Sequence, residues 1–149
     1  MIYVANSLVD TENFGKVLGE MLEGGMIVCL TGDLGAGKTT LSKTLIASLG
    51  VTEDVTSPTY TIVNEYDNDP RVFHFDVYRI CDIDEFYEIG YEDYFNQNAV
   101  CIIEWANIVE EVIPEDAIWI DIKYCQGDGC RELTVTGNQK LIDSFERKL

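Results

Sequence analysis

The segment Gly32-Asp33-Leu34-Gly35-Ala36-Gly37-Lys38-Thr39 reads G-x-x-x-x-G-K-T, the pattern of a phosphate-binding loop. Its glycines let the backbone wrap closely, so that successive N–H groups converge on phosphate oxygens. The ammonium of Lys38 suits the β- and γ-phosphates of a nucleotide, and the hydroxyl of Thr39 suits Mg²⁺. The segment therefore predicts a site for a nucleotide and its metal ion.

The residues on either side of the loop fit the strand–loop–helix order that this motif requires. Residues 26–30, Met-Ile-Val-Cys-Leu, form a short apolar run that is typical of a buried parallel strand. Gly50 is placed to end a helix whose apolar residues recur at Leu41, Leu45, Ile46 and Leu49. The positive N-terminus of that helix would attract an anion. This context argues against a glycine-rich turn that matches by chance.

Length and composition predict a single domain, residues 1–149, with a sizeable core. No apolar run approaches the ~20 residues of a membrane span, and no secretory signal is visible, so we expect a cytoplasmic protein. The formal net charge of -17 disfavours direct binding to a nucleic-acid backbone, although it could also serve solubility alone. If the protein serves RNA chemistry, a basic partner should hold the RNA.

The cysteines give no sign of a metal site. Cys29 and Cys101 lie in expected core strands, where cysteine acts as a small apolar residue. Cys125 and Cys130 could face each other across a hairpin, but in a cytosolic protein we expect them to be reduced. Zinc is not expected, because there is no C-x-x-C motif and the only histidine, His74, is far away in sequence.

The remaining patterns predict an α/β fold. Strands are expected at residues 2–4, 60–66, 72–77, 100–103, 117–124 and 132–136, besides the strand before the loop. Besides the helix after the loop, helices are expected from an Asp10 cap to Gly24-Gly25, within 82–96 with a break at Gly90, and over 138–149. We therefore predict a three-layer P-loop NTPase-like domain, whose mixed, mainly parallel-cored sheet is extended by antiparallel hairpins.

Two acids follow expected strands and are candidates to hold Mg²⁺ or to orient water. Glu104 follows the apolar run 100–103, which resembles a Walker B strand ending in Glu, and Asp76 closes the run from Val72. Either could equally be a solvated acid at a strand end. The segment Ser57–Thr61 has the position of switch I in related proteins, where a threonine senses the γ-phosphate, or it is simply a polar loop.

The roles of two further side chains stay open. His74 could be a hydrogen-bonded structural residue, and Trp105 could stack on a base or pack.

The guanine-reading N-K-x-D motif does not occur, so adenine is the expected base. A small-molecule kinase normally closes an arginine-rich lid, but this chain has only Arg71, Arg79, Arg131 and Arg147.

Four motifs in order resemble the TsaE (YjeE) family, the ATPase component of bacterial tRNA threonylcarbamoyladenosine biosynthesis. They are residues 32–40 (GDLGAGKTT), 57–61 (SPTYT), 74–79 (HFDVYR) and 103–105 (IEW). The resemblance spans nearly the whole chain. It departs from the family after Arg79, where Pro-Glu-Glu-Leu is common but residues 82–86 read Asp-Ile-Asp-Glu-Phe.

The resemblance implies a set of roles. Asp76, Glu104 and Lys38 would be catalytic, with Asp76 assisting hydrolysis through water, and Thr39 and Glu104 would bind Mg²⁺. ATP or ADP would be bound by Asp33, Leu34, Gly35, Ala36, Gly37, Lys38, Thr39, Thr40 and Arg131. The segment Ser7–Thr11 would approach the adenine, although it matches the family only loosely.

The partner implied by the resemblance is a TsaB–TsaD-like complex, in which TsaD transfers the threonylcarbamoyl group to the adenosine at position 37 of tRNA. The nucleotide cycle of this chain would reset that complex between turnovers, with tRNA engaged only indirectly. Two alternatives stay open on the sequence: a P-loop small-molecule kinase and a nucleotide sensor that does not hydrolyse.

Overall fold

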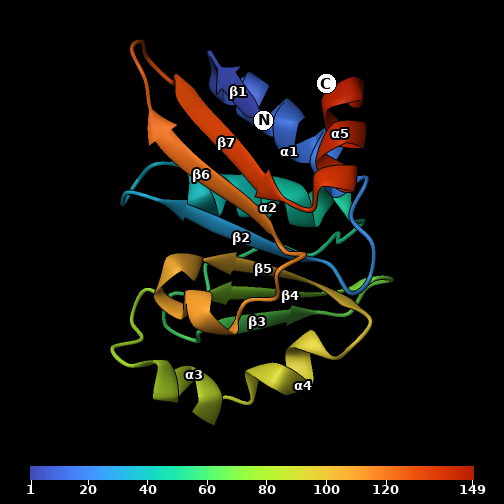
Figure 1. The fold of residues 1–149 in the computed structure, drawn as a ribbon, viewed down its shortest axis with the longest axis vertical. Coiled ribbons are helices and arrows are strands. Elements are labelled where there is room, and N and C mark those ends of the chain that lie inside the picture. The colour runs from blue at the N-terminus through green and yellow to red at the C-terminus, as the bar shows by residue number, and fades with distance from the viewer.

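The computed structural model describes residues 1–149 and is built on one seven-stranded sheet. The sheet order is β1-β7-β6-β2-β5-β4-β3 (Figure 1). Its strands are β1 (Ile2–Ala5), β2 (Ile27–Gly32), β3 (Val63–Tyr66), β4 (Arg71–Asp76), β5 (Ala99–Glu104), β6 (Ile118–Tyr124) and β7 (Arg131–Gly137). The helices are α1 (Leu8–Gly19), α2 (Lys38–Ser48), α3 (Ile83–Glu88), α4 (Tyr91–Phe95), the 3₁₀ helix η1 (Ala106–Val112) and α5 (Gln139–Lys148).

The centre of the sheet is parallel and its margins are antiparallel. Strand β2 pairs in parallel with β6 and β5, and β5 pairs in parallel with β4. The antiparallel pairs β3–β4, β6–β7 and β1–β7 extend the sheet on both sides. This confirms the predicted α/β class and mixed sheet. None of the helices is long and apolar enough to cross a membrane.

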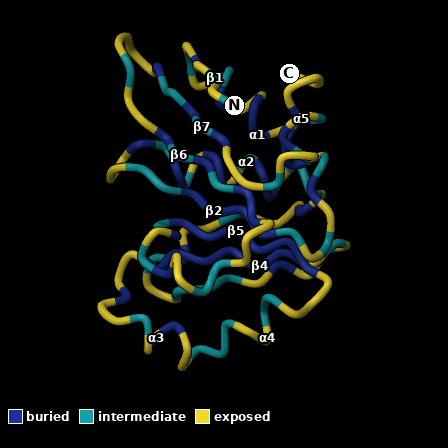
Figure 2. Tube along the Cα trace, viewed as in Figure 1, coloured by how far each residue is buried: buried dark blue, intermediate teal, exposed yellow.

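Helices cover both faces of the sheet, which gives three layers. Because side chains alternate along a strand, Val100 and Ile102 of β5 face a core of 22 buried residues shared with α1, α2 and α5. Cys101 and Ile103 face a second core of 13 buried residues, against which α3, α4 and η1 pack. Figure 2 shows the central strands buried. The two cores hold the carboxyl ends of β2, β4 and β5 in fixed positions.

Helix α1 begins and ends earlier than the sequence predicts. Its N-cap is Ser7, not Asp10: Ser7 is extended, and its Oγ accepts from the backbone N of Asp10 at 3.3 Å. The Asp10 carboxylate in turn accepts from the backbone N of Asn6 at 2.9 Å, so the acid lies inside the first turn. The helix ends at Gly19, because short i→i+3 bonds to Leu18 and Gly19 close its last turn before Gly24-Gly25 is reached.

The strand predicted over residues 60–66 is also shorter, although its antiparallel pairing with β4 is confirmed. The backbone N–H groups of Thr61 and Ile62 both donate to the carbonyl of Pro58, at 3.1 and 2.7 Å. These bonds form a turn in which Ile62 has φ +70°, so pairing begins only at Val63. The other predicted elements agree with the structure to within about three residues, including the break at Gly90, whereas the 3₁₀ helix η1 was not predicted.

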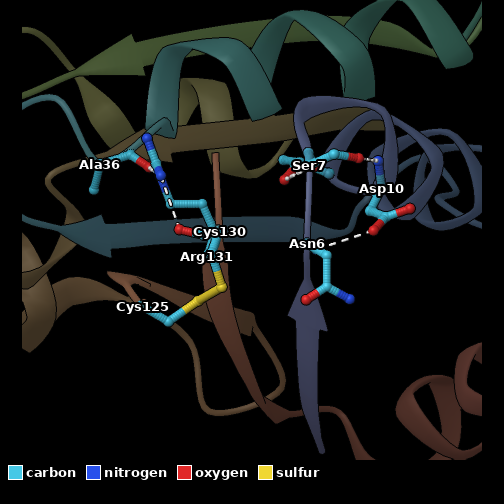
Figure 3. Close-up of a disulfide and its surroundings, with 8 residues drawn as sticks. Asn6, Ser7, Asp10, Ala36, Cys125, Cys130 and Arg131 are labelled. Atoms are coloured by element: carbon cyan, nitrogen blue, oxygen red, sulfur yellow. Dashed lines mark hydrogen bonds between the residues drawn. A yellow bond between two sulfur atoms is a disulfide. The ribbon is translucent and has the colours of Figure 1, made fainter. Parts of the chain in front are cut away.

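The expectation that Cys125 and Cys130 are reduced is wrong: they form a disulfide at the end of the β6–β7 hairpin (Figure 3). Tyr124 pairs with Arg131, and this register brings the two cysteines that follow and precede them to a Cα–Cα distance of 5.3 Å. Cys29 and Cys101 are free and buried, as predicted. Burial raises the pKa of both thiols, to about 12 for Cys101, so neither is reactive.

Candidate functional site

The glycine loop joins β2 to α2, as the motif requires. A Cβ on Gly32 would lie 2.5 Å from the carbonyl oxygen of Ile122, so no larger residue fits where the loop leaves the sheet. Gly37 is the N-cap of α2 and has φ +117°, a conformation that residues with side chains rarely adopt. These two glycines let the loop fold back over the N-terminus of α2, where backbone N–H groups are available to an anion.

Lys38 is the first residue of α2, and its side chain points back into the glycine loop. Its Nζ donates to the carbonyls of Gly32 at 2.6 Å and Asp33 at 2.8 Å, and lies 4.0 Å from the centroid of the Trp105 ring. Burial lowers the pKa of Lys38, whereas the carboxylates of Glu104 and Asp76 act in the opposite direction. An ammonium has three N–H donors, so one remains for a ligand in the cavity beside the loop.

The register of the parallel strands brings the two predicted acids together. Asp76 at the end of β4 pairs with Glu104 at the end of β5, because both strands run the same way and end at the same edge. Glu104 is 1% exposed, and its Oε1 accepts from the hydroxyl of Thr39 at 2.8 Å. The interpretation of Glu104 as a solvated strand-end acid is therefore wrong.

Asp76 is buried too, and it connects the site to the segment Ser57–Thr61. Its Oδ2 accepts from the Thr59 hydroxyl at 3.1 Å, and its Oδ1 accepts from the backbone N of Tyr78 at 3.0 Å. The Thr59 hydroxyl also lies 2.7 Å from that of Ser57. The carboxylate is thus fixed by two donors, so a movement of Thr59 would change the hydrogen bonding of Asp76.

These groups line one cavity of about 310 Å³. Its walls are Leu34, Gly35, Gly37, Lys38, Thr39, Thr40, Thr59, Asp76, Tyr78, Glu104 and Trp105. The cavity therefore combines most of the predicted nucleotide residues with both predicted acids. A larger hollow of about 750 Å³ lies between α1 and α2, but no such set of groups converges on it.

Arg131 and Ala36 lie outside that cavity and support the loop from behind. The Nε of Arg131 donates to the carbonyl of Ala36 at 2.7 Å, and its Nη1 donates to the carbonyl of Cys130 at 2.8 Å (Figure 3). Its guanidinium also lies 4.4 Å from the centroid of the Tyr124 ring. Asp33 is exposed and contributes its carbonyl to Lys38. The structure thus brings Arg131 to the loop, 95 residues away in sequence.

Two residues hold Glu104 from behind: Ser42, which sequence reasoning missed, and His74, for which it left open a hydrogen-bonded structural role without naming the partner. Ser42 is four residues after Lys38 on α2, and His74 is two residues before Asp76 on β4, so each faces the same side as a predicted site residue. Their Oγ and Nε2 lie 3.2 and 2.5 Å from Oε2 of Glu104. Helical periodicity could have identified Ser42, and strand periodicity could have placed His74 on the same face as Asp76.

The donor set fits Mg²⁺ held together with a phosphate. The Thr39 hydroxyl and the Glu104 carboxylate are hard oxygen donors at the wall of the cavity. No group of three or more His, Cys, Asp or Glu side chains forms a metal cage. Mg²⁺ does not need one, since it commonly takes one or two protein oxygens, substrate phosphates and water.

The strand–loop–helix unit at the centre of a mixed parallel sheet defines a P-loop protein. Comparisons with known proteins narrow this class. Residues 5–133 match the model of a family described as "Threonylcarbamoyl adenosine biosynthesis protein TsaE". The crystal structure of YdiB from Bacillus subtilis superposes with a TM-score of 0.80 at 33% identity, covering 99% of this chain and 95% of that one.

Curated relatives carry the same family name. The tRNA threonylcarbamoyladenosine biosynthesis protein TsaE of Treponema pallidum is 39% identical over 132 residues, covering 89% of this chain and 97% of the relative. The protein of that name in Haemophilus influenzae is 42% identical over 140 residues, covering 89% of each chain. The chain belongs to the TsaE family.

Proposed function

We propose that this chain binds ATP with Mg²⁺ and hydrolyses it slowly, as the ATPase component of tRNA threonylcarbamoyladenosine biosynthesis. One observation carries the proposal: Lys38, Thr39, Asp76 and Glu104 come from three separate parts of the chain and line one cavity beside the loop. Family membership favours this function over a small-molecule kinase, for which the chain has few arginines.

The binding chemistry follows from the positions of these groups. The loop N–H groups and the N-terminus of α2 would receive the phosphate oxygens, and Lys38 would direct its remaining N–H to the β- and γ-phosphates. Thr39 and Glu104 would hold Mg²⁺, which supplies neutralisation of the charge that develops on the phosphate oxygens. Leu34, Gly35 and Thr40 line the same wall, as a cradle around the phosphates requires.

Asp76 would act on the attacking water. Its two oxygens are already oriented by Thr59 and by the backbone N of Tyr78, and a carboxylate oxygen has a further lone pair with which to accept a proton from water. Positioning of the water in line with the γ-phosphate is its expected contribution. Its burial beside Glu104 keeps the carboxylate inside the cavity and away from bulk solvent.

The hydrogen bond between Thr59 and Asp76 also supports a partner interaction that is controlled by the nucleotide. Thr59 belongs to the segment Ser57–Thr61, in which the next residue, Tyr60, is 82% exposed, so a change at Asp76 has a short path to the surface. We infer that the segment takes one arrangement with ATP and another with ADP, and that a TsaB–TsaD-like complex reads the difference. Because the chain carries a net charge of -17, tRNA would be engaged only through that complex.

Mg²⁺–ATP should raise the melting temperature, because it binds only the folded state. At a hundred times the dissociation constant the gain is ~2.7 kcal/mol, or roughly 5–10 °C for a domain of this size. GTP should give a smaller shift, since no guanine-reading motif is present. Differential scanning fluorimetry with the two nucleotides at matched concentrations measures both. Equal shifts would overturn the adenine preference, and no shift with either would overturn nucleotide binding.

A further inference from the structure

We propose that His74 is a positioning residue that fixes the carboxylate of Glu104 for Mg²⁺. The inference rests on the proposed function, because it assigns His74 to the metal side of that same site. His74 is fully buried on β4, and side-chain alternation places it on the face of the sheet that carries Asp76. From there its Nε2 lies 2.5 Å from Oε2 of Glu104.

The direction of this hydrogen bond follows from chemistry. Glu104 would bind Mg²⁺ as an ionised carboxylate, which only accepts hydrogen bonds, so in the metal-binding arrangement the Nε2 of His74 would be the donor. The other oxygen of Glu104, Oε1, accepts from the hydroxyl of Thr39 at 2.8 Å. The carboxylate therefore has one oxygen held from behind and one turned toward the threonine that would share the metal ion.

No other side chain holds Oε2 as firmly. The hydroxyl of Ser42 lies 3.2 Å from Oε2, but it also lies 2.9 Å from the carbonyl of Lys38, one helical turn back. A hydroxyl has one proton, and the shorter bond is the one to the backbone. The Nε2 of His74, at 2.5 Å, is therefore the closer of the two donors to this oxygen.

The core itself gives no reason for an imidazole at this place. The Nδ1 of His74 is buried and has no hydrogen-bond partner. His74 pairs with Ile102 on the neighbouring strand, and Val72 precedes it on the same face, so its surroundings would accept an apolar side chain. An unpartnered polar atom is a cost to folding. The hydrogen bond from Nε2 to Glu104 offsets this cost and gives the imidazole its role.

Two variants of similar polarity separate positioning from packing. In His74→Gln the amide nitrogen stands three bonds from Cβ, as Nε2 does, so it can still donate to Glu104. In His74→Asn the amide is one bond shorter and cannot reach. The probe is ADP, titrated by calorimetry in Mg²⁺ and again in EDTA, and the quantity measured is the affinity gain that Mg²⁺ produces.

We expect His74→Asn to lose about tenfold to a hundredfold of that gain, while its affinity in EDTA is unchanged. His74→Gln should keep the gain within about threefold of the wild type. Melting temperatures without ligand show whether each variant is folded. If His74→Asn does not fold, His74→Leu replaces it, since an apolar side chain suits the surroundings but donates nothing.

The outcomes distinguish this inference from the proposed function. A folded His74→Asn or His74→Leu variant with the wild-type Mg²⁺ gain would overturn the role of His74 alone. Equal loss in His74→Gln would overturn it as well, because the retained donor would then make no difference. If the wild-type chain shows no nucleotide binding or no Mg²⁺ gain, the proposed function fails, and this inference fails with it.

Discussion

Replacing Lys38 with alanine is expected to weaken ATP binding by roughly tenfold to a hundredfold, since removing a charged hydrogen-bond partner costs ~1.5–3 kcal/mol. The ammonium lies at the centre of the loop and contacts the carbonyls of Gly32 and Asp33. The variant therefore loses both the charge that would meet the phosphates and the group that closes the loop. Calorimetric titration with ATP and a phosphate-release assay measure the effect.

Lys43→Ala is the matched control for this change. Lys43 is on the same helix, five residues on, and it is exposed. Its removal changes the net charge by the same amount, so any general electrostatic effect on ATP appears in both variants. Affinity and phosphate release that are the same in Lys38→Ala as in the wild type would refute the phosphate-loop assignment.

Asp76→Asn and Glu104→Gln are expected to separate water positioning from metal binding. Asp76→Asn should leave ATP binding largely intact and slow hydrolysis by about 10²–10⁴-fold, the usual contribution of a general base. Glu104→Gln should lower turnover and weaken Mg²⁺ dependence together, because a neutral amide is a poor metal ligand. Turnover measured over a range of Mg²⁺ concentrations distinguishes the two patterns.

Glu110→Gln serves as control for both, since Glu110 is an exposed acid six residues after Glu104. It should hydrolyse ATP at the wild-type rate. Wild-type rates in Asp76→Asn and Glu104→Gln would show that the two buried acids do not take part in the reaction.

The sequence was most informative where the chemistry is local or follows from parallel strands. The phosphate-loop motif is contained in the consecutive residues Gly32 to Thr39, and the patterns of a strand and a helix lie on either side of it. Asp76 and Glu104 were each identified as candidates because both end apolar runs, and the parallel pairing of β4 with β5 in the structure brings them to one edge of the sheet. The antiparallel hairpins were also predictable from turn residues.

Other features depend on register and packing, which local patterns do not encode. The contact of Arg131 with the carbonyl of Ala36 requires β7 to lie at one exact register beside β6. The same register pairs Cys125 with Cys130. The contact between His74 and Glu104 depends on the pairing of β4 with β5, which the residues around His74 do not indicate.

The measurement that tests the account most directly is co-purification of this chain with a TsaB–TsaD-like complex in ATP, in ADP and without nucleotide. We predict recruitment that depends on the nucleotide and differs between ATP and ADP, because the segment Ser57–Thr61 reaches the cavity through Asp76. Free tRNA should bind the isolated chain very weakly, given its net charge of -17. Tight tRNA binding by the isolated chain, with no recruitment of the complex in any nucleotide state, would contradict the account.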